Sequence, residues 1–495
     1  MERSTVGMVA FDNTYARLPD RFYARVAPTK VGAPRVVKVN RPLAALLGAD
    51  ADQLASDVGA AFLSGNEIPA GAEPLALAYA GHQFGGFVPQ LGDGRAILLG
   101  EVVGADGRRR DIQLKGSGRT PFSRGGDGRA ALGPVLREYL VSEHMAALGI
   151  PTTRALAVVT TGERVVRERA LPGAVLTRVA ASHLRVGTFE YFAARGDREA
   201  VAALTAHALE RHYPDAAGAE APALALLARV IEAHAQLVAR WMGVGFVHGV
   251  MNTDNTAISG ETLDYGPCAF LDEYVPSKKF SSIDHGGRYA FANQPRIALW
   301  NMARFAETLL ELIASDEAQA IRLATEQLDR FPALFEAAAL RVHRAKLGLA
   351  REEPGDGALI DDLLGCLAAG RVDFTTFFRR LCASAADAAA DSQVHDLFDD
   401  PAVFATWAES WRRRLADEAA SPQERAAAMR RANPAFIPRN HRVEEAIEAG
   451  LRGDFAPFER LNEVLGRPYE DQPEHADLAD PPGPEQHAYQ TFCGT

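Results

Sequence analysis

The chain has 495 residues, of which 47% are hydrophobic and 24% are charged, so it can bury a sizeable core. Its formal net charge of −11 argues against general binding of nucleic acids. The first 20 residues have no continuous apolar core, no apolar run approaches the roughly eighteen residues of a membrane span, and four cysteines do not make a disulfide framework. We therefore expect a cytoplasmic monomer that binds neither membranes nor nucleic acid.

The first part of the chain is predicted to be an extension followed by a small sheet. Residues 1–78 form the extension, with short helical patches such as 42–47. Asp106–Gly107 is a hairpin signal, and a glycine-rich, basic loop at 116–128 leads into a helix predicted at 133–148. Apolar runs predict short strands at 96–103, 110–114, 155–160, 164–167 and 174–179.

The second half of the chain is predicted to be helical. A long helix is expected at 221–242, directly before a loop that begins at His248, and another at 296–314. Residues 317–465 are alanine-rich with helical spacing. The acidic, proline-rich segment 471–486 is expected to be irregular.

Lys115 and Glu138 form the first candidate constellation. Lys115 ends a predicted strand and opens a glycine-rich loop, and Glu138 lies in the middle of the next predicted helix. A kinase uses a strand lysine on the nucleotide phosphates and holds it with a helix glutamate. The alternative is a surface lysine and a solvated glutamate, and we favour the functional interpretation because the lysine sits between an alternating strand and a flexible loop.

The glycine-rich loops are candidate phosphate-binding segments. Glycines allow backbone amides to approach phosphate oxygens, and the following helix N-terminus favours anions. The segment Gly92-Asp93-Gly94-Arg95 precedes the first predicted strand and can cover phosphates as well. Arg178 and Arg185 flank the junction between the strand-rich and helical parts. The second loop region concentrates positive charge in an otherwise acidic protein, at Lys115, Arg119, Arg124 and Arg129.

The loop from His248 to Asn255 has the spacing of a kinase catalytic loop, H-R-D-x-x-x-x-N, and Asp264 opens a D-F-G-like triplet. Asn255 and Asp264 offer the hard oxygen ligands that Mg²⁺ prefers. Val250 stands where a kinase has its catalytic aspartate, and an aliphatic side chain cannot accept a proton. Asp254 is the candidate base, although a turn or cap residue is the alternative. We expect His248 to be a structural hydrogen-bonding residue.

Together these segments resemble the selenoprotein O family of protein adenylyltransferases, the YdiU-like proteins. The resemblance covers about residues 79–310 and resumes at 433–441 and 468–469. The segments that carry it are Gly81-His-Gln-Phe-Gly85, Gln113-Leu-Lys-Gly-Ser-Gly-Arg-Thr-Pro-Phe-Ser-Arg124, His248-Gly-Val-Met-Asn-Thr-Asp-Asn255 and Asp264-Tyr-Gly-Pro267.

The resemblance implies an α+β, protein-kinase-like, two-lobed fold with an N-terminal extension and a helical C-terminal extension. We place an extension at 1–78, the N-lobe at 79–180, the helical C-lobe at 181–395, and a C-terminal helical extension with an acidic tail at 396–495. Members bind ATP in an orientation flipped relative to kinases and transfer AMP to Ser, Thr or Tyr hydroxyls of proteins, releasing pyrophosphate. The implied metal is Mg²⁺, with Mn²⁺ as the alternative. Uridylyl transfer from UTP with Mn²⁺ and a non-catalytic pseudokinase scaffold are the alternative functions.

The resemblance also implies roles for individual residues. Lys115 would contact phosphate and pair with Glu138, Asp254 would accept the proton, and Asn255 and Asp264 would hold the metal. The residues implied to line the nucleotide site are Gly92, Gly94, Arg95, Asp127, Gly128, Arg178 and Arg185.

Cys493 lies third from the C-terminus, where some family members carry selenocysteine. Some bacterial relatives pair this cysteine with one near residues 280–283, but that segment has no cysteine here. Cys268 lies in an apolar run and is expected to be buried. We therefore expect no stable intramolecular disulfide at Cys493.

Overall fold

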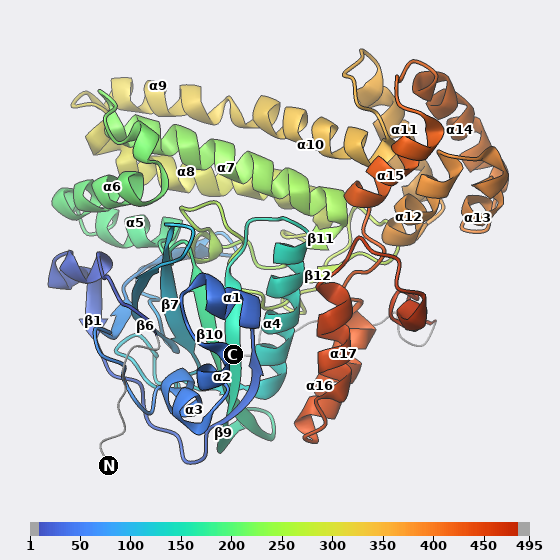
Figure 1. The fold of residues 1–495 in the computed structure, drawn as a ribbon. Coiled ribbons are helices and arrows are strands. Elements are labelled where there is room, and N and C mark those ends of the chain that lie inside the picture. Colours follow the sequence, from blue (N-terminus) through green and yellow to red (C-terminus); the bar gives the residue numbers. More distant parts are fainter. Residues whose placement is uncertain (1–8, 484–495) are drawn as a thin grey trace.

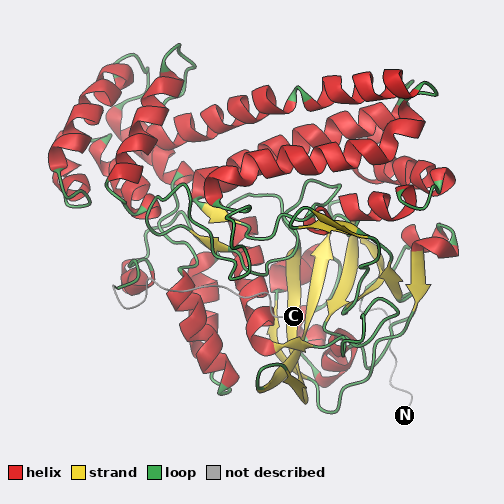
Figure 2. Cartoon of the chain, turned by 180° about the vertical axis from the view of Figure 1, so that it is seen from behind, coloured by secondary structure: helices red, strands yellow, loops and turns green. Residues whose placement is uncertain are grey.

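The computed structural model describes residues 9–483 and confirms the expected α+β class. One part of the molecule is a twisted sheet with a few helices packed on it, and the other part is helical (Figure 1). The long strands lie together beneath a long layer of helices, and a short pair of strands lies apart from them (Figure 2).

The central sheet has the strand order β1-β3-β6-β7-β10-β9-β2, and β8 pairs with β10. All of its paired neighbours are antiparallel. The strands are β1 (Tyr23–Arg25), β2 (Arg35–Val39), β3 (Leu75–Leu77), β6 (Ala96–Val103), β7 (Arg109–Lys115), β8 (Ala130–Ala131), β9 (Arg154–Val166) and β10 (Ala170–Ala180). Three of them come from the first 78 residues, so part of the expected extension is built into the sheet. The runs predicted at 155–160 and 164–167 form one strand, β9.

Both faces of the sheet are covered, because successive side chains of a strand point to opposite faces. On β10, Val175 packs into the cluster under the N-terminal helices, whereas Leu176 packs under α4. The N-terminal helices are α1 (Arg41–Leu46), α2 (Ala51–Leu54) and α3 (Asp57–Ser64). The cluster around Leu176 also includes residues of α4 (Leu132–Ala147), α16 (Asn440–Leu451) and α17 (Ala456–Leu465). Residues far apart in sequence therefore hold α4 against the sheet (Figure 1).

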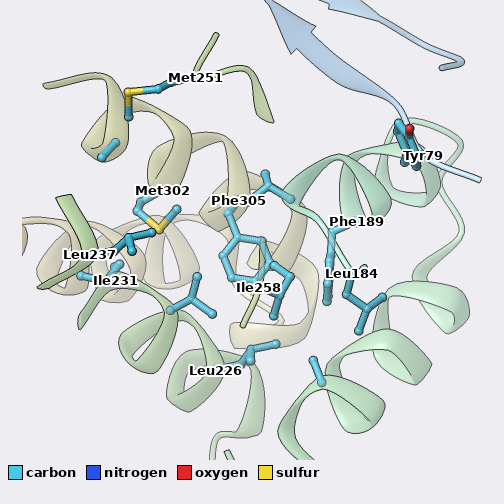
Figure 3. Close-up of a cluster of buried hydrophobic side chains, with 14 of the residues drawn as sticks. Tyr79, Leu184, Phe189, Leu226, Ile231, Leu237, Met251, Ile258, Met302 and Phe305 are labelled. Atoms are coloured by element: carbon cyan, nitrogen blue, oxygen red, sulfur yellow. The ribbon is translucent and has the colours of Figure 1, made fainter. Parts of the chain in front are cut away.

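The helical part has a core that continues to the edge of the sheet. Phe189 and Phe305 meet edge to face with ring centroids 5.0 Å apart, and Tyr79 joins the same cluster from the chain that leaves β3 (Figure 3). The helices are α5 (Val186–Ala193), α6 (Arg198–His212), α7 (Pro222–Val244), α8 (Gln294–Ile313), α9 (Glu317–Leu328) and α10 (Phe331–Leu347). This continuous core fixes the helical part relative to the sheet.

A separate apolar cluster lies at the far end of the helical layer. It includes the stacked rings of Trp407 and Trp411, whose centroids are 5.5 Å apart. The helices around it are α11 (Asp356–Ala369), α12 (Phe374–Ser384), α13 (Asp391–His395), α14 (Pro401–Leu415) and α15 (Pro422–Ala432). The predicted helical character of 317–465 is confirmed.

By length and composition, α7 could cross a membrane: its most apolar 18-residue window has a mean hydropathy of 1.3. The helix contains Arg229, Glu232 and Arg240, so it holds no uninterrupted apolar run of about eighteen residues. In addition, 56% of that window is buried inside the fold. The helix packs against α8 and α10, as a core helix does.

The chain after α17 is more ordered than expected. The segment predicted to be irregular contains a 3-10 helix at Pro473–Leu478, and Leu478 is buried in the cluster beside α16 and α17. The prediction was wrong there because it rested on acidic and proline-rich composition. Composition cannot indicate that Leu478 packs against helices distant in the sequence. Cys268 is buried, as expected. Cys493 lies outside the described residues.

Candidate active site

A cavity of about 590 Å³ opens between the sheet and the helical part. Its walls come from the end of β7, from α4, from the loop after β11 (Phe246–Val247) and from the hairpin of β4 (Gly81–Gln83) and β5 (Gly86–Val88). Six of the predicted site residues line it: Arg95, Lys115, Glu138, Asp254, Asn255 and Asp264.

Lys115 lies at the centre of a charge cluster on one wall. Its Nζ is 2.6 Å from Glu138 Oε2 and 3.2 Å from Asp264 Oδ1. Arg178 forms very short contacts with both of these carboxylates. Lys115 is paired with Leu176 across β7 and β10, and Arg178 lies two residues further along β10. Lys115 and Arg178 therefore share a face of the sheet, and α4 brings Glu138 onto it.

Both carboxylates of this cluster are held ionised. Burial by itself would raise the pKa of Glu138, but the charges of Arg178 and Lys115 outweigh it and keep that pKa below its ordinary value. Burial would likewise raise the pKa of Asp264, but the positive charges of Arg178, Lys115 and Arg185 outweigh burial and hold that pKa well below its usual range. The cluster can therefore present fixed positive and negative charge to a polyphosphate and a metal ion.

Asp264 adopts an unusual backbone conformation, with φ of +67°. Such a conformation is uncommon for residues other than glycine and is found preferentially at functional sites. Arg185 links this position to the loop from His248 to Asn255, because its Nη1 lies 3.3 Å from Asp264 Oδ2 and donates to the Asp254 carbonyl at 2.6 Å.

His248 braces the loop that carries the other acidic groups. Its Nε2 lies 2.9 Å from the Leu263 carbonyl, and its Nδ1 accepts from the Val250 N–H at 3.3 Å. The ring is buried, and burial lowers its pKa, so it stays neutral. The structural role expected for His248 fits these contacts. Asn255 donates its amide N–H to the Val250 carbonyl at 3.1 Å, which leaves its amide oxygen as the group that can bind a metal.

Asp254 is a buried carboxylate at the floor of the cavity. Its Oδ2 accepts from Gln83 Nε2 at 3.1 Å, and its Oδ1 has no hydrogen-bond partner within residues 9–483. Burial raises its pKa to about 6. A carboxylate with one unpartnered oxygen and a raised pKa is suited to accept a proton.

The β4–β5 hairpin positions Asp254, and the sequence reasoning assigned no role to it. The His82 N–H donates to Thr253 Oγ1 at 2.6 Å, and the Thr253 hydroxyl donates to Glu190 Oε2 at 2.6 Å. His82 Nδ1 lies 2.6 Å from Glu190 Oε1. This network holds the neighbouring Gln83 against Asp254. The available signal was the run Gly81-His-Gln-Phe-Gly85, whose spaced glycines mark a tight hairpin.

Six predicted nucleotide residues do not line the cavity: Gly92, Gly94, Asp127, Gly128, Arg178 and Arg185. A Cβ on Gly92 would lie 2.3 Å from Phe122 Cγ, so this glycine allows the loop 116–128 to pack. Asp127 forms a salt bridge of 2.8 Å with Arg167. Arg178 and Arg185 reach the site through Asp264, as described above.

The residues present fit a divalent metal that also binds phosphate. No group of three or more His, Cys, Asp or Glu in the described part of the chain could hold a metal ion alone. Asp264 and Asn255 supply a carboxylate and an amide oxygen on the same cavity. Mg²⁺ is commonly bound by one or two such protein groups together with substrate phosphates and water.

Comparison with known proteins gives a consistent result. The sequence model of the family described as "Protein adenylyltransferase SelO" matches residues 6–465. The chain is 63% identical over 492 residues to a protein of Methylorubrum populi named "Protein nucleotidyltransferase YdiU", covering 98% of this chain and 99% of that protein. It is 62% identical over 486 residues to a protein of the same name from Bradyrhizobium sp. (strain ORS 278), with the same coverage of each chain.

Proposed function

Because the chain belongs to the SelO protein adenylyltransferase family and is a protein nucleotidyltransferase, we propose that it transfers AMP from ATP to Ser, Thr or Tyr hydroxyls of proteins. The observation that carries the proposal is the placement of Asp254. Asp254 lines the same cavity as Lys115 and Asp264, and its Oδ1 has no hydrogen-bond partner within residues 9–483. Aliphatic Val250 stands at the kinase base position. We further propose that the sheet and the helical part correspond to the two lobes of a kinase-like fold.

The triphosphate is held by the charge cluster. Lys115, Arg95 and Arg124 line the cavity and supply positive charge to the phosphates. Glu138 fixes Lys115, while Arg178 and Arg185 fix Asp264. Gly92, Gly94, Asp127 and Gly128 shape the two loops that approach the nucleotide.

Asn255 and Asp264 are the residues that would hold Mg²⁺, with Mn²⁺ as the alternative. A bound metal would neutralise charge on the phosphates. Asp264 is already ionised in the fold, so it needs no proton release to act as a ligand.

Asp254 then removes the proton from the acceptor hydroxyl. The hydroxyl oxygen forms a bond to the α-phosphorus of ATP as the bond from that phosphorus to the β-phosphate bridging oxygen breaks. Pyrophosphate leaves, and the proton remains on the Asp254 carboxyl. Gln83 and the network behind it keep the carboxylate aimed at the acceptor.

Parallel labelling tests the proposal. Label from α-³²P-ATP is expected to enter protein, including the enzyme itself, and label from γ-³²P-ATP is not. Transfer of γ-label alone would show a kinase reaction instead. The second candidate, uridylyl transfer, is tested with α-³²P-UTP and Mn²⁺ in the same assay; preferential labelling from UTP would favour it.

A further inference from the structure

Large apolar side chains are exposed at the cavity and on the hairpin beside it. Phe84 and Phe87 of the β4–β5 hairpin are 37% and 41% exposed, and Ile283 is 58% exposed. Phe84 and Ile283 line the cavity, and Phe87 lies opposite His82 across the hairpin. We call Phe84, Phe87 and Ile283 the rim. Phe84 and Ile283 thus place apolar surface on the cavity that holds Asp254, and Phe87 extends it on the face of the hairpin that carries His82.

The conformation of Phe84 indicates that this exposure is specified by the fold. Phe84 has φ of +52°, which is uncommon for a bulky residue. Its N–H lies 3.1 Å from both Asn252 Oδ1 and Tyr289 Oη, and its ring packs on that of Tyr289 at 5.1 Å. These contacts hold a strained residue with its ring partly in water, which contributes little to a hydrophobic core. Strain of this kind is found preferentially at binding and catalytic sites.

The surroundings of the rim are basic in a chain whose net charge is −11. The segment 277–288 carries Lys278, Lys279 and Arg288 against one acid, Asp284. The Asp284 carboxylate is used within the fold, accepting from the Arg288 and Tyr289 N–H groups at 2.9 Å each. The Arg288 guanidinium instead lies over an aromatic ring, 4.6 Å from the centroid of Trp300. The charge of this surface therefore complements an acidic partner.

The hairpin also offers an edge to an extended chain. In the described part of the protein, β4 and β5 form a sheet of their own, so β5 is an edge strand. β4 is the strand that packs against α5 and the Thr253–Asn255 turn. An extended peptide can add to such an edge by backbone hydrogen bonds while its side chains occupy neighbouring apolar surface.

We propose that the rim is the docking surface for the acceptor protein, and that it binds an extended segment with apolar and acidic residues next to the modified hydroxyl. Gln83, which donates to Asp254, directly precedes Phe84 in the chain. A segment seated on Phe84 therefore brings a neighbouring hydroxyl to the Asp254 carboxylate. This inference rests on the proposed nucleotidyl transfer to proteins.

The test uses the full-length enzyme and two peptides, each with one tyrosine flanked either by Asp and Leu or by Lys and Leu. The variants are Phe87→Ser, Ile283→Ser and Arg288→Glu, with Ile321→Ser as the control because Ile321 is 47% exposed on α9 and does not line the cavity. Transfer of α-label gives kcat and KM for each peptide. ATP affinity by calorimetry and the thermal midpoint report on the nucleotide site and the fold.

Wild type and Ile321→Ser are expected to prefer the acidic peptide. Phe87→Ser and Ile283→Ser are each expected to raise KM for that peptide by about tenfold, since a partly exposed apolar side chain loses its burial in the complex. Arg288→Glu is expected to shift the preference toward the basic peptide, and ATP affinity is expected to stay unchanged in all variants.

Unchanged peptide KM in the two serine variants overturns the inference even when the wild type transfers label. A change of oligomeric state in Phe87→Ser, measured by sedimentation without any change in peptide KM, also overturns it and assigns the rim to contacts between copies of the chain. Absence of transfer by the wild type to any protein or peptide refutes the proposed function, and the inference with it.

Discussion

Replacing Gly81 by alanine is expected to displace the Asp254 carboxylate while leaving the ATP-binding residues in place. A Cβ built on Gly81 lies 2.6 Å from Asp254 Oδ1, 2.9 Å from its Cβ and 3.0 Å from its Cγ. Ordinary van der Waals contact begins at 3.4 Å. The Asp254 side chain must therefore move by about 0.8 Å, the difference between 3.4 Å and 2.6 Å, or the hairpin must retreat.

The size of the effect follows from the geometry of proton transfer. A misplacement of about 1 Å in a catalytic constellation can cost roughly 10²-fold in rate. We expect Gly81→Ala to lower the rate of AMP transfer by about 10- to 100-fold. ATP affinity should be nearly unchanged, because Lys115 and Asp264 are held by Glu138 and Arg178.

Gly86→Ala is the matched control on the same hairpin. The nearest atom to a Cβ at Gly86 is the Gln83 carbonyl oxygen at 3.5 Å, so alanine fits there without displacement. Single-turnover incorporation of α-³²P label measures the chemical step, and calorimetry measures ATP binding. Equal transfer rates in Gly81→Ala and Gly86→Ala would refute the reasoning, since the clash would then have been absorbed away from Asp254.

Four further substitutions have expected outcomes that can be measured. Asp254→Asn is expected to lower transfer by about 10²–10⁴-fold with ATP affinity unchanged by calorimetry, and loss of ATP binding would make Asp254 a structural residue. Asp264→Ala is expected to abolish transfer at any Mg²⁺ concentration, whereas Asn255→Ala should retain weak nucleotide binding; wild-type turnover of the Asp264 variant in chelator-treated buffer would contradict its role as a metal ligand. Burial lowers the pKa of Lys346 to about 7 from its ordinary value of 10.5, so the unfolded chain binds more protons between these values and stability should rise with pH above about 7. Lys346→Met should remove this dependence and stabilise the protein at neutral pH by about 1–4 kcal/mol; urea unfolding with the same pH dependence in both proteins would argue against a depressed pKa.

The β6–β7 hairpin, α4, α7 and α8 were predicted within a few residues from the sequence, because periodicity and turn chemistry are local properties. Lys115 and Glu138 could be predicted in the same way, since they are only 23 residues apart, at the end of β7 and within α4. The boundaries of β9 and the packing of Pro473–Leu478 were missed. Strand pairing and contacts with distant helices decide those features.

The sequence by itself determined which chemistry the chain can carry: a lysine at a strand end, a helix glutamate, a loop with Asp254 and Asn255, an acidic Asp264 triplet, and an aliphatic Val250 where a kinase has its base. Only the tertiary structure decided how these groups act together. Gln83 and Asp254 are 171 residues apart, and His82 and Glu190 are 108 residues apart. The packing of the hairpin onto α5 and onto the loop from His248 to Asn255 brings them within hydrogen-bond distance. It also removes water from Asp254 and thereby raises its pKa, and no local pattern encodes that burial.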